Sequence, residues 1–521
     1  MSESTVAIVG SGIAGTTIAY LLTRKGYDVD IFEKGPYYPY PHLPQFRDRI
    51  LHLYENPAYR LPNDLQNLTL SGNYPADPDG ERYLGVGGSA THWDAIALRI
   101  PPQDFKTRSR YGYGDDWPVS YDDLEPYYCD AEHLLGVSGT DTDNPFAPRR
   151  SRPYPLPPFA LSYDDRILAE RLHGHGIVLH TTPQARTRLP YDKRPGCQNF
   201  GTCQVCPIGV RYSPTHHLMR AVETGRCRVH INTSVRRLVL DRAGRARALV
   251  YQHNTGTTDQ EHGAKVIIVA AGAIESARLL LLSSIERHPD GLTHGGHVGQ
   301  HLTFHHDWWA HLHYEDNFLP GSIGAQTGQS HQFLDPPGRG RHGGIKVEFI
   351  SKYGIFQTLS VEGRTGPEIT DELKEMRHWC VLNLHAESLQ SPKKFVALSA
   401  TRDRWGDPFA HVHYESSAFD HETHRFAQQI FDKFVAATHA DHAELGGVDD
   451  GYFSAYHHMG TCRMGVDAGD SVVDRVGRVH GISNLFVIGS SNFTSPGTVN
   501  PTLTIAALAI RAGEYVADQV L

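Results

Sequence analysis

The sequence predicts an α/β fold in which a nucleotide-binding domain with a parallel sheet carries an inserted α+β domain with an antiparallel sheet. Three observations predict this fold. The chain opens with a buried strand, a glycine-rich turn and a helix, and the same succession returns at 265–283. Between 301 and 449, polar loops separate short segments that alternate as antiparallel strands do. We therefore expect residues 1–300 and 450–521 to form the first domain, and residues 301–449 the second.

The composition excludes several classes of protein. A chain of 521 residues is too long for a single core, so two or more domains are expected. A net charge of −9 argues against a nucleic-acid-binding surface or an anionic-membrane surface. The apolar run 266–274 reaches about half of the roughly 20 residues that a membrane span needs, so none is predicted. Because no basic segment precedes the first strand, we expect cytoplasmic residence; the alternative is periplasmic residence after co-export with a signal-bearing partner.

The first element is a Rossmann-like βαβ unit. Residues 5–9 form the strand, and Gly10, Gly12 and Gly15 follow in a GxGxxG turn that opens a helix. Such glycines let the backbone approach a pyrophosphate held at the helix N-terminus. Glu33 ends the second strand and is placed to bind a ribose hydroxyl. A glycine turn without a ligand is the alternative, but the complete unit favours a dinucleotide.

The later elements follow in order along the chain. We expect helices and strands at 163–177 (helix), 227–252 (paired strands), 265–283 (strand, glycine turn and helix), 306–314, 345–353 and 393–400 (strands of the inserted sheet), 417–439 (helix), and 484–521 (strand and final helix). A nicotinamide enzyme would be shorter and would not need the second strand–glycine–helix phrase or the closing strand and helix. An adenine dinucleotide held by distant segments favours FAD over NAD.

Six phrases carry a family resemblance. They are "VAIVGSGIAG", "GVGGSATHWDA", "VAAGAIESARLL", "GQHLTFH", "HHMGTCRMG" and "NLFVIGSSNFTSPGTVNPTLTIAALAIR". In this order, and over almost the whole chain, they resemble the glucose-methanol-choline (GMC) oxidoreductase family. The resemblance implies the GMC fold, a bound FAD and oxidation of an alcohol carbon.

The phrase "HHMGTCRMG" at 457–465 contains the predicted base. In the family, His-x-x-Gly-Thr places a histidine over the flavin, and His457 matches that register. A neutral imidazole there would take the hydroxyl proton while the hydride passes to flavin N5. Asn500 matches the second catalytic position and would hydrogen-bond the substrate oxygen. Metal binding by the adjacent pair is disfavoured because neighbouring side chains point apart on a strand. We interpret His458 as a packing residue and Cys462 as buried and inert.

The resemblance also implies the residues that contact the cofactor. They are Gly10, Gly12, Ile13, Ala14, Gly15, Glu33, Lys34, Gly87, Gly88, Ser89, Ala90, Thr91, His92, Trp93, Val235, Ala271, Gly272, Ser491, Asn500, Pro501 and Thr502. The Thr-His-Trp core at 91–93 is similar to a phrase of pyranose oxidases in which the histidine is bonded covalently to the flavin. Covalent FAD at His92 and plain packing of the loop around the flavin are the two interpretations.

Three cysteines form a separate cluster. Cys197, Cys203 and Cys206 have C-x5-C-x2-C spacing, and three thiolates in one loop can hold an iron–sulfur cluster. The loop resembles that of bacterial glucose, gluconate and fructose dehydrogenase large subunits, where cysteines bind a 3Fe-4S cluster that passes electrons to a haem subunit. The spacing differs here. A zinc site that recruits His216 or His217, and ordinary loop thiols, are the alternatives.

The predicted function is FAD-dependent oxidation of an alcohol group of a sugar, glycoside or related polyol, with His457 as base. Residues 301–449 would be the substrate-binding domain, and the remainder the FAD-binding domain. The alternatives concern the electron acceptor. One is an oxygen-reducing pyranose or glycoside oxidase. The other is the flavoprotein subunit of a multi-subunit dehydrogenase, with a small subunit or a cytochrome as acceptor. A non-catalytic flavin subunit, and a lyase or isomerase that uses FAD structurally, are more distant alternatives.

Overall fold

The structure is a computed structural model. It describes residues 2–37, 68–75, 82–91, 93–199, 203, 206, 208–286, 292, 295–319, 323–324, 326–350, 366–447 and 452–521.

The first sheet is the nucleotide-binding sheet. Its strands run in the order β5-β2-β1-β8-β7-β6, and β17 pairs with β8. The bounds are β1 (Ser2–Val9), β2 (Val29–Phe32), β5 (Cys227–His230), β6 (Thr233–Leu240), β7 (Ala246–His253), β8 (Gln260–Val269) and β17 (Leu485–Val487). Pairing is parallel from β5 to β8 and between β8 and β17, whereas β6 and β7 are antiparallel. The apolar runs of β1 and β8 are buried on both faces, as parallel strands between helices require.

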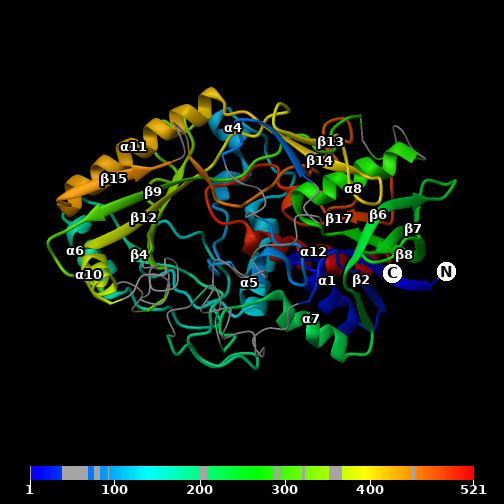
Figure 1. Ribbon diagram of the computed structural model, residues 1–521, viewed down its shortest axis with the longest axis horizontal. Coiled ribbons are helices and arrows are strands. Elements are labelled where there is room, and N and C mark those ends of the chain that lie inside the picture. Colours follow the sequence, from blue (N-terminus) through cyan, green and yellow to red (C-terminus); the bar gives the residue numbers. More distant parts are fainter. Residues whose placement is uncertain are drawn as a thin grey trace.

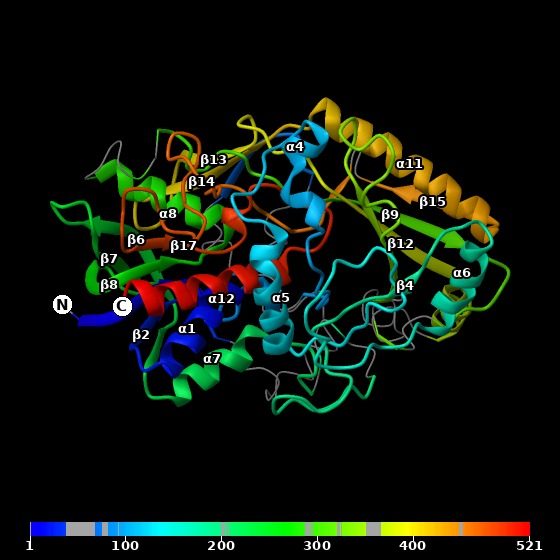
Figure 2. The same ribbon diagram turned by 180° about the vertical axis from the view of Figure 1, so that it is seen from behind.

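Helices cover this sheet and join the two ends of the chain. They are α1 (Ile13–Arg24), α5 (Tyr121–Leu135), α7 (Pro214–Glu223), α8 (Gly272–Glu286) and α12 (Thr502–Gln519). Helix α1 packs against α7 and α12, and α12 packs against α5 (Figure 2). Small residues let α12 approach closely: a Cβ added to Gly513 would meet Leu21 Cδ1 at 3.4 Å. The last helix therefore completes the layer that the first helix begins.

The second sheet is antiparallel throughout. Its strands run in the order β15-β9-β12-β11-β10-β4, and β16 pairs with β9. The bounds are β4 (His180–Thr181), β9 (His306–His313), β10 (Gln326–Ser330), β11 (Ile345–Ile350), β12 (Trp379–Ala386), β15 (His442–Gly446) and β16 (Phe453–Ser454). Helices α6 (Tyr163–His173) and α11 (Ala418–Thr438) contribute to one apolar core with this sheet (Figure 1). A Ser417–Asp420 capping box begins α11.

A third, smaller sheet differs from the sequence expectation. The segment at 393–400 was expected in the inserted sheet, but β13 (Phe395–Arg402) instead pairs with β14 (Pro408–Tyr414), which pairs in parallel with β3 (Leu68–Gly72). Both β13 and β14 contact α8 of the nucleotide-binding part (Figure 1). The short helices are η2 (Gly88–Thr91), η3 (Pro102–Phe105), α4 (Thr107–Tyr111), α10 (Pro367–Glu375), η5 (Met376–His378) and η6 (Ser490–Asn492). The division at residues 300 and 450 stays a prediction.

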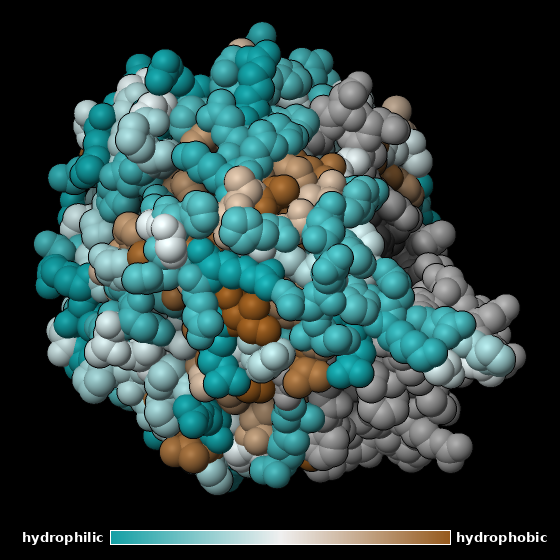
Figure 3. Space-filling model, turned by 90° about the vertical axis from the view of Figure 1, so that its left-hand side faces the viewer, coloured by the Kyte–Doolittle hydropathy of each residue, from teal (hydrophilic) through white to brown (hydrophobic). Residues whose placement is uncertain are grey.

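The outer face beside α11 and β15 is mostly hydrophilic. Figure 3 shows its hydrophobic residues in small groups separated by hydrophilic ones. Among the described residues, no helix combines the length and the apolar character needed to span a bilayer.

Candidate active site

One cavity of about 570 Å³ runs from the glycine turn after β1 to the second sheet. Most of the predicted cofactor and catalytic residues line it. These are Gly10, Gly12, Ile13, Ala14, Glu33, Lys34, Gly88, Ser89, Ala90, Trp93, Val235, Ala271, Gly272, His457, Asn500, Pro501 and Thr502. The residues that do not line it are Gly15, Gly87, Thr91 and Ser491, and His92 is outside the described residues. Segments far apart in the sequence thus meet around one cavity.

The three glycines of the turn differ in what a side chain would meet at each position. Gly10 has a φ of +98°, and a Cβ there would lie 2.5 Å from the Ala270 carbonyl oxygen. A Cβ on Gly15 would lie 2.1 Å from the Gly10 carbonyl oxygen, so Gly15 packs the helix onto the strand instead of lining the cavity. Gly12 caps α1 without a side-chain hydrogen bond, and a Cβ there would meet nothing within 4 Å. The helix N-terminus is therefore open toward the cavity and fits a pyrophosphate.

Glu33 is fixed at the end of β2. Its Oε2 accepts hydrogen bonds from Ser11 N at 3.0 Å and Ser11 Oγ at 2.7 Å, and its Oε1 accepts from Gly35 N at 3.0 Å. Ser11 Oγ in turn accepts from Gly87 N at 3.1 Å. Gly87 therefore supports the site from behind. A carboxylate held this firmly on the cavity wall fits the ribose contact of an adenine dinucleotide.

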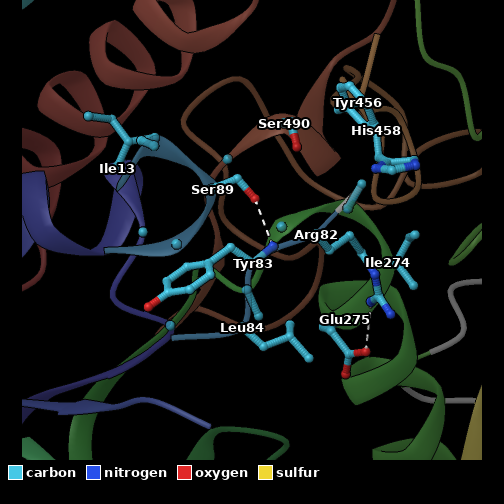
Figure 4. Close-up of a pocket in the computed structure, with 18 of the residues that line it drawn as sticks. Ile13, Arg82, Tyr83, Leu84, Ser89, Ile274, Glu275, Tyr456, His458 and Ser490 are labelled. Atoms are coloured by element: carbon cyan, nitrogen blue, oxygen red, sulfur yellow. Dashed lines mark hydrogen bonds and ion pairs between the residues drawn. The ribbon is translucent and has the colours of Figure 1, made fainter. Parts of the chain in front are cut away.

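A buried ionic cluster lines the same end of the cavity. Arg82 Nη1 lies 3.1 Å from Glu275 Oε1 (Figure 4). Lys34 Nζ lies 3.9 Å from Glu275 Oε2. Burial raises the pKa of Glu275, but Lys34, Arg278 and Arg82 outweigh it and hold the pKa at about 2. Burial lowers the pKa of Lys34 to about 8. Of this cluster, the sequence indicated only Lys34.

Two backbone hydrogen bonds join the segment that contains His457 to the segment that contains His305. Thr303 N donates to the Met459 carbonyl at 3.0 Å, and Met459 N donates to the Thr303 carbonyl at 2.8 Å. Gly460, with a φ of +92°, allows this approach because a Cβ there would lie 2.3 Å from the His301 carbonyl oxygen. The glycine of His-x-x-Gly-Thr is therefore needed to bring two distant histidines together.

Three histidines meet at the cavity, which His385 and His457 line. His305 Nδ1 lies 3.1 Å from His457 Nδ1, and His385 Nδ1 lies 2.8 Å from Asp307 Oδ1. The ring centroids of His305 and His385 are 4.3 Å apart. His305 Nε2 lies 3.0 Å from the carbonyl oxygen of Gly497. The sequence indicated His457 but gave no role to His305 or His385.

This arrangement sets the tautomer of His457. The Gly497 carbonyl can only accept, so His305 Nε2 carries the hydrogen and His305 Nδ1 has a lone pair. His457 Nδ1 must then donate to His305 Nδ1, which leaves His457 Nε2 with a lone pair. Burial lowers the pKa of His457 well below its usual range, and His305 and Lys346 lower it further. A neutral imidazole with an unprotonated Nε2 is the form that can accept a proton.

Asn500 has a partner that the sequence did not indicate. The ammonium group of Lys346, which is completely buried, donates to Asn500 Oδ1 and to Glu348 Oε1. Because the amide oxygen of Asn500 accepts from the lysine, its NH₂ group is left as the donor toward the cavity. Glu348 Oε2 accepts from Gln326 Nε2 at 3.1 Å.

The second sheet presents a polar face to the cavity. Asp307, Trp309, Glu348, Asn383 and His385 all line it. His385 lies opposite Asp307 and Asn383 opposite Trp309 in the pairing of β12 with β9, and Glu348 lies opposite Asn383 in the pairing of β11 with β12. In the sequence, the alternation of polar residues along these strands was the feature that could have indicated a polar face.

The side chain of His458 hydrogen-bonds Tyr74, whereas that of His457 hydrogen-bonds His305. Tyr74 Oη hydrogen-bonds His458 Nε2, and the two rings are stacked with centroids 6.2 Å apart. His458 and Tyr456 lie on the cavity wall opposite Ile13 (Figure 4). The predicted packing role of His458 agrees with these contacts. Cys462 is completely buried, and burial raises the pKa of its thiol to about 12.

The three loop cysteines are not part of the histidine group His305, His385 and His457. Burial raises the pKa of Cys197, and Cys203 and Cys206 raise it further. Arg186 Nη1 lies 3.5 Å from Cys203 Sγ. His216 and His217 instead lie 3.1 Å and 3.3 Å from Asp192 Oδ2 through their Nε2 atoms. Among the described residues, these histidines thus group with a carboxylate and not with the thiols.

A dinucleotide cradle that opens onto a neutral histidine defines the class as a flavin-dependent oxidoreductase. Residues 182–307 and 392–509 match family models described as GMC oxidoreductase, and residues 8–38 match an NAD(P)-binding Rossmann-like domain. The chain belongs to the GMC oxidoreductase family. The enzyme uses FAD to oxidise a CH–OH group.

Individual relatives cover nearly the full length. The chain is 29% identical to the fructose dehydrogenase large subunit of Gluconobacter japonicus, with 99% of this chain and 98% of the relative aligned. It is 30% identical to a 2-methyl-1,2-propanediol dehydrogenase of Mycolicibacterium austroafricanum, over 99% of this chain and 95% of the relative. Pyridoxine 4-oxidase from Mesorbium loti has the same fold, with a TM-score of 0.67, 18% identity and 99% of both chains covered.

Proposed function

We propose that the substrate is a sugar, a glycoside or a related polyol, and that it lies between the flavin and the polar face of the second sheet. The observation that carries this proposal is the set of hydrogen-bonding side chains on that face, among them Asp307, Glu348 and Asn383. Several hydroxyl groups on one substrate could bond to them at once. The relatives named for fructose and for a diol support the same class.

His457 is the base in this proposal. Its Nε2 accepts the hydroxyl proton of the substrate, because Nδ1 already carries a hydrogen and donates to His305. FAD, when bound, supplies the acceptor for the hydride that leaves the carbon. Asn500 holds the substrate oxygen through its NH₂ group, and Lys346 fixes the amide from behind. Proton transfer and oxygen binding thus come from two different segments.

A panel of alcohols tests the substrate class. The oxidised holoenzyme is mixed without oxygen with fructose, glucose, a methyl glycoside, a linear polyol and a simple monohydric alcohol, and flavin absorption is recorded. Bleaching by the polyhydroxyl compounds, at concentrations where the monohydric alcohol has little effect, is expected. Equal bleaching by the monohydric alcohol would show that the polar face does not select the substrate.

Replacing Lys346 with methionine should slow flavin reduction by about tenfold or more, because Asn500 then loses the group that orients it. Buried Glu348 also loses its cation, at a cost of about 3–5 kcal/mol of stability. The Lys346→Met/Glu348→Gln double variant is the control, since it removes the unpaired charge. It should recover stability but not the rate. Thermal melts and stopped-flow reduction measure the two effects separately.

The electron acceptor depends on the cysteine loop. A 3Fe-4S cluster held by Cys197, Cys203 and Cys206 would make the enzyme a dehydrogenase that passes electrons to a small subunit or a cytochrome. Cys203 and Cys206 both raise the pKa of Cys197, and this electrostatic contact among the three thiols supports the proposal. About three irons per chain, lost in Cys206→Ser, are expected. An iron-free protein that reduces oxygen would favour the alternative, a pyranose or glycoside oxidase.

Covalent attachment of the flavin and the cellular location are two further proposals. Covalent attachment of FAD at His92 predicts that the yellow colour remains with the protein after acid precipitation, and that it is released in His92→Ala. Cytoplasmic residence, with co-export beside a signal-bearing partner as the alternative, is decided by cell fractionation.

A further inference from the structure

The histidine cluster around His457 has the donor set of a metal site. One ring nitrogen from each of His305, His385 and His457 lies within 4.8 Å of the other two. Three imidazoles with an open fourth position are the donor set of several zinc sites, and imidazole also suits copper and nickel. In its proposed role as base, His457 needs neither His385 nor the Asp307 carboxylate behind it.

The nitrogens that remain free for a cation follow from the hydrogen bonds. His305 uses Nε2 on the Gly497 carbonyl, which leaves its Nδ1. His385 uses Nδ1 on Asp307, which leaves its Nε2. His385 is 2% exposed, and its Nε2 is buried without a hydrogen-bond partner among the residues that the structure describes. An unpartnered buried nitrogen on a ring whose centroid lies 4.3 Å and 5.2 Å from those of His305 and His457 is a second sign of a ligand site.

The distances and supporting groups fit a tetrahedral ion. Zinc–nitrogen bonds of about 2.0–2.1 Å place two imidazole nitrogens about 3.3 Å apart, and His305 Nδ1 and His457 Nδ1 are separated by 3.1 Å. The third nitrogen lies within 4.8 Å, so a shift of at most about 1.5 Å closes the site. Asp307 and the Gly497 carbonyl each hold the other nitrogen of a ligand, as outer partners of metal-bound histidines do.

The charges nearby allow a cation. Lys346 is paired with Glu348, so the carboxylate of Asp307 beside His385 is an additional negative charge. The other three-residue group in the described part of the chain is weaker. There, Arg220 Nη1 lies 2.5 Å and 2.6 Å from the two oxygens of Asp192, and a cation already occupies that carboxylate.

We propose that His305, His385 and His457 bind a divalent transition-metal ion of the zinc class, which enters from the substrate cavity and inhibits the enzyme. The inhibition rests on the proposed function, whereas the binding does not. The ion takes His457 Nδ1, and the displaced proton moves to Nε2. Nε2 can then no longer accept the hydroxyl proton of the substrate, and the fourth position of the ion faces the cavity.

Cobalt(II) is the probe for binding. It is added to the oxidised holoenzyme without substrate, at wavelengths beyond the flavin bands. Intense d–d bands of a four-coordinate ion that saturate at one cobalt per chain, and that zinc displaces, are expected. Asp307→Asn should weaken binding about 10–100-fold, and His385→Gln should abolish it. His216→Gln, from the Asp192 group, is the matched control and should bind as the unchanged protein does.

If the cobalt spectrum shows nothing but the weak bands of an octahedral, water-exposed ion, the proposal is overturned. Equal affinity in His385→Gln, or loss of binding in His216→Gln, would overturn it as well. If His385→Gln fails to fold, Asp307→Asn alone decides. Turnover with zinc is measured separately and should recover fully on addition of a chelator. Binding without inhibition would contradict the role of His457 as base, and inhibition without the cobalt bands would contradict the metal site.

Discussion

Replacing His457 with alanine should slow flavin reduction by the substrate about 10²–10⁴-fold while the flavin stays bound. The reason is local. Nε2 of His457 is the unprotonated nitrogen at the cavity, because its Nδ1 donates to His305. Gly12 and Glu33, the residues proposed to hold the dinucleotide, line the other end of the cavity and are not affected. Stopped-flow flavin reduction without oxygen, together with the flavin content of the purified variant, gives both quantities.

The neighbouring histidine supplies the matched control for this variant. His458 also lines the cavity, but it hydrogen-bonds Tyr74 and stacks on its ring. His458→Ala should therefore slow flavin reduction much less than His457→Ala. If His458→Ala had the larger effect, His458 and not His457 would be the base, and the match of His457 to the His-x-x-Gly-Thr motif would be wrong.

Acidification should destabilise the protein strongly, beginning near pH 6.5. Burial lowers the pKa values of His301, His305 and His306 to about 3 each. Below pH 6.5 the unfolded chain binds protons at these positions and the folded chain does not, so stability falls as the pH falls from 6.5 toward 3. At pH 5 each residue costs about 2 kcal/mol, and the three together about 6 kcal/mol. That is comparable with the total stability of many proteins, about 5–15 kcal/mol.

Thermal or urea unfolding between about pH 8 and pH 5 measures this loss. His306→Gln should lower the slope of the unfolding free energy against pH by the equivalent of about one bound proton, because it removes one buried titrating group. His442, which is exposed, is the control, and His442→Gln should leave the slope unchanged. A stability that does not change between pH 7 and pH 5 would contradict the neutral state of these buried histidines.

The nucleotide end of the cavity was predictable because its signals are local. Gly10, Gly12 and Gly15 lie within six residues, and Glu33 ends the next strand. The resemblance to the GMC family then indicated His457 and Asn500, which both line the cavity. Ser491 was expected to contact the cofactor. It is completely buried and is not among the residues that line the cavity, whereas its neighbour Ser490 is.

The substrate end was not predictable, because its residues meet only through strand register. Asp307 and His385 come together because β9 and β12 pair at that position. The contact of Lys346 with Asn500 joins β11 to the segment before the last helix, across 154 residues. The sequence showed these strands, but it did not show which polar side chains share a face. For the same reason β13 was assigned to the wrong sheet.

The central claim is that a neutral His457 accepts the hydroxyl proton through Nε2. The most direct test is the rate constant of flavin reduction by a saturating polyol as a function of pH, measured without oxygen. Because burial, His305 and Lys346 lower the pKa of His457 well below 6.5, the rate should stay constant from about pH 8 to pH 6.5. A rate that already falls with an apparent pKa near 6.5 or above, where the residual rate of His457→Ala shows no such fall, would mean that His457 itself is protonated there and would contradict the claim.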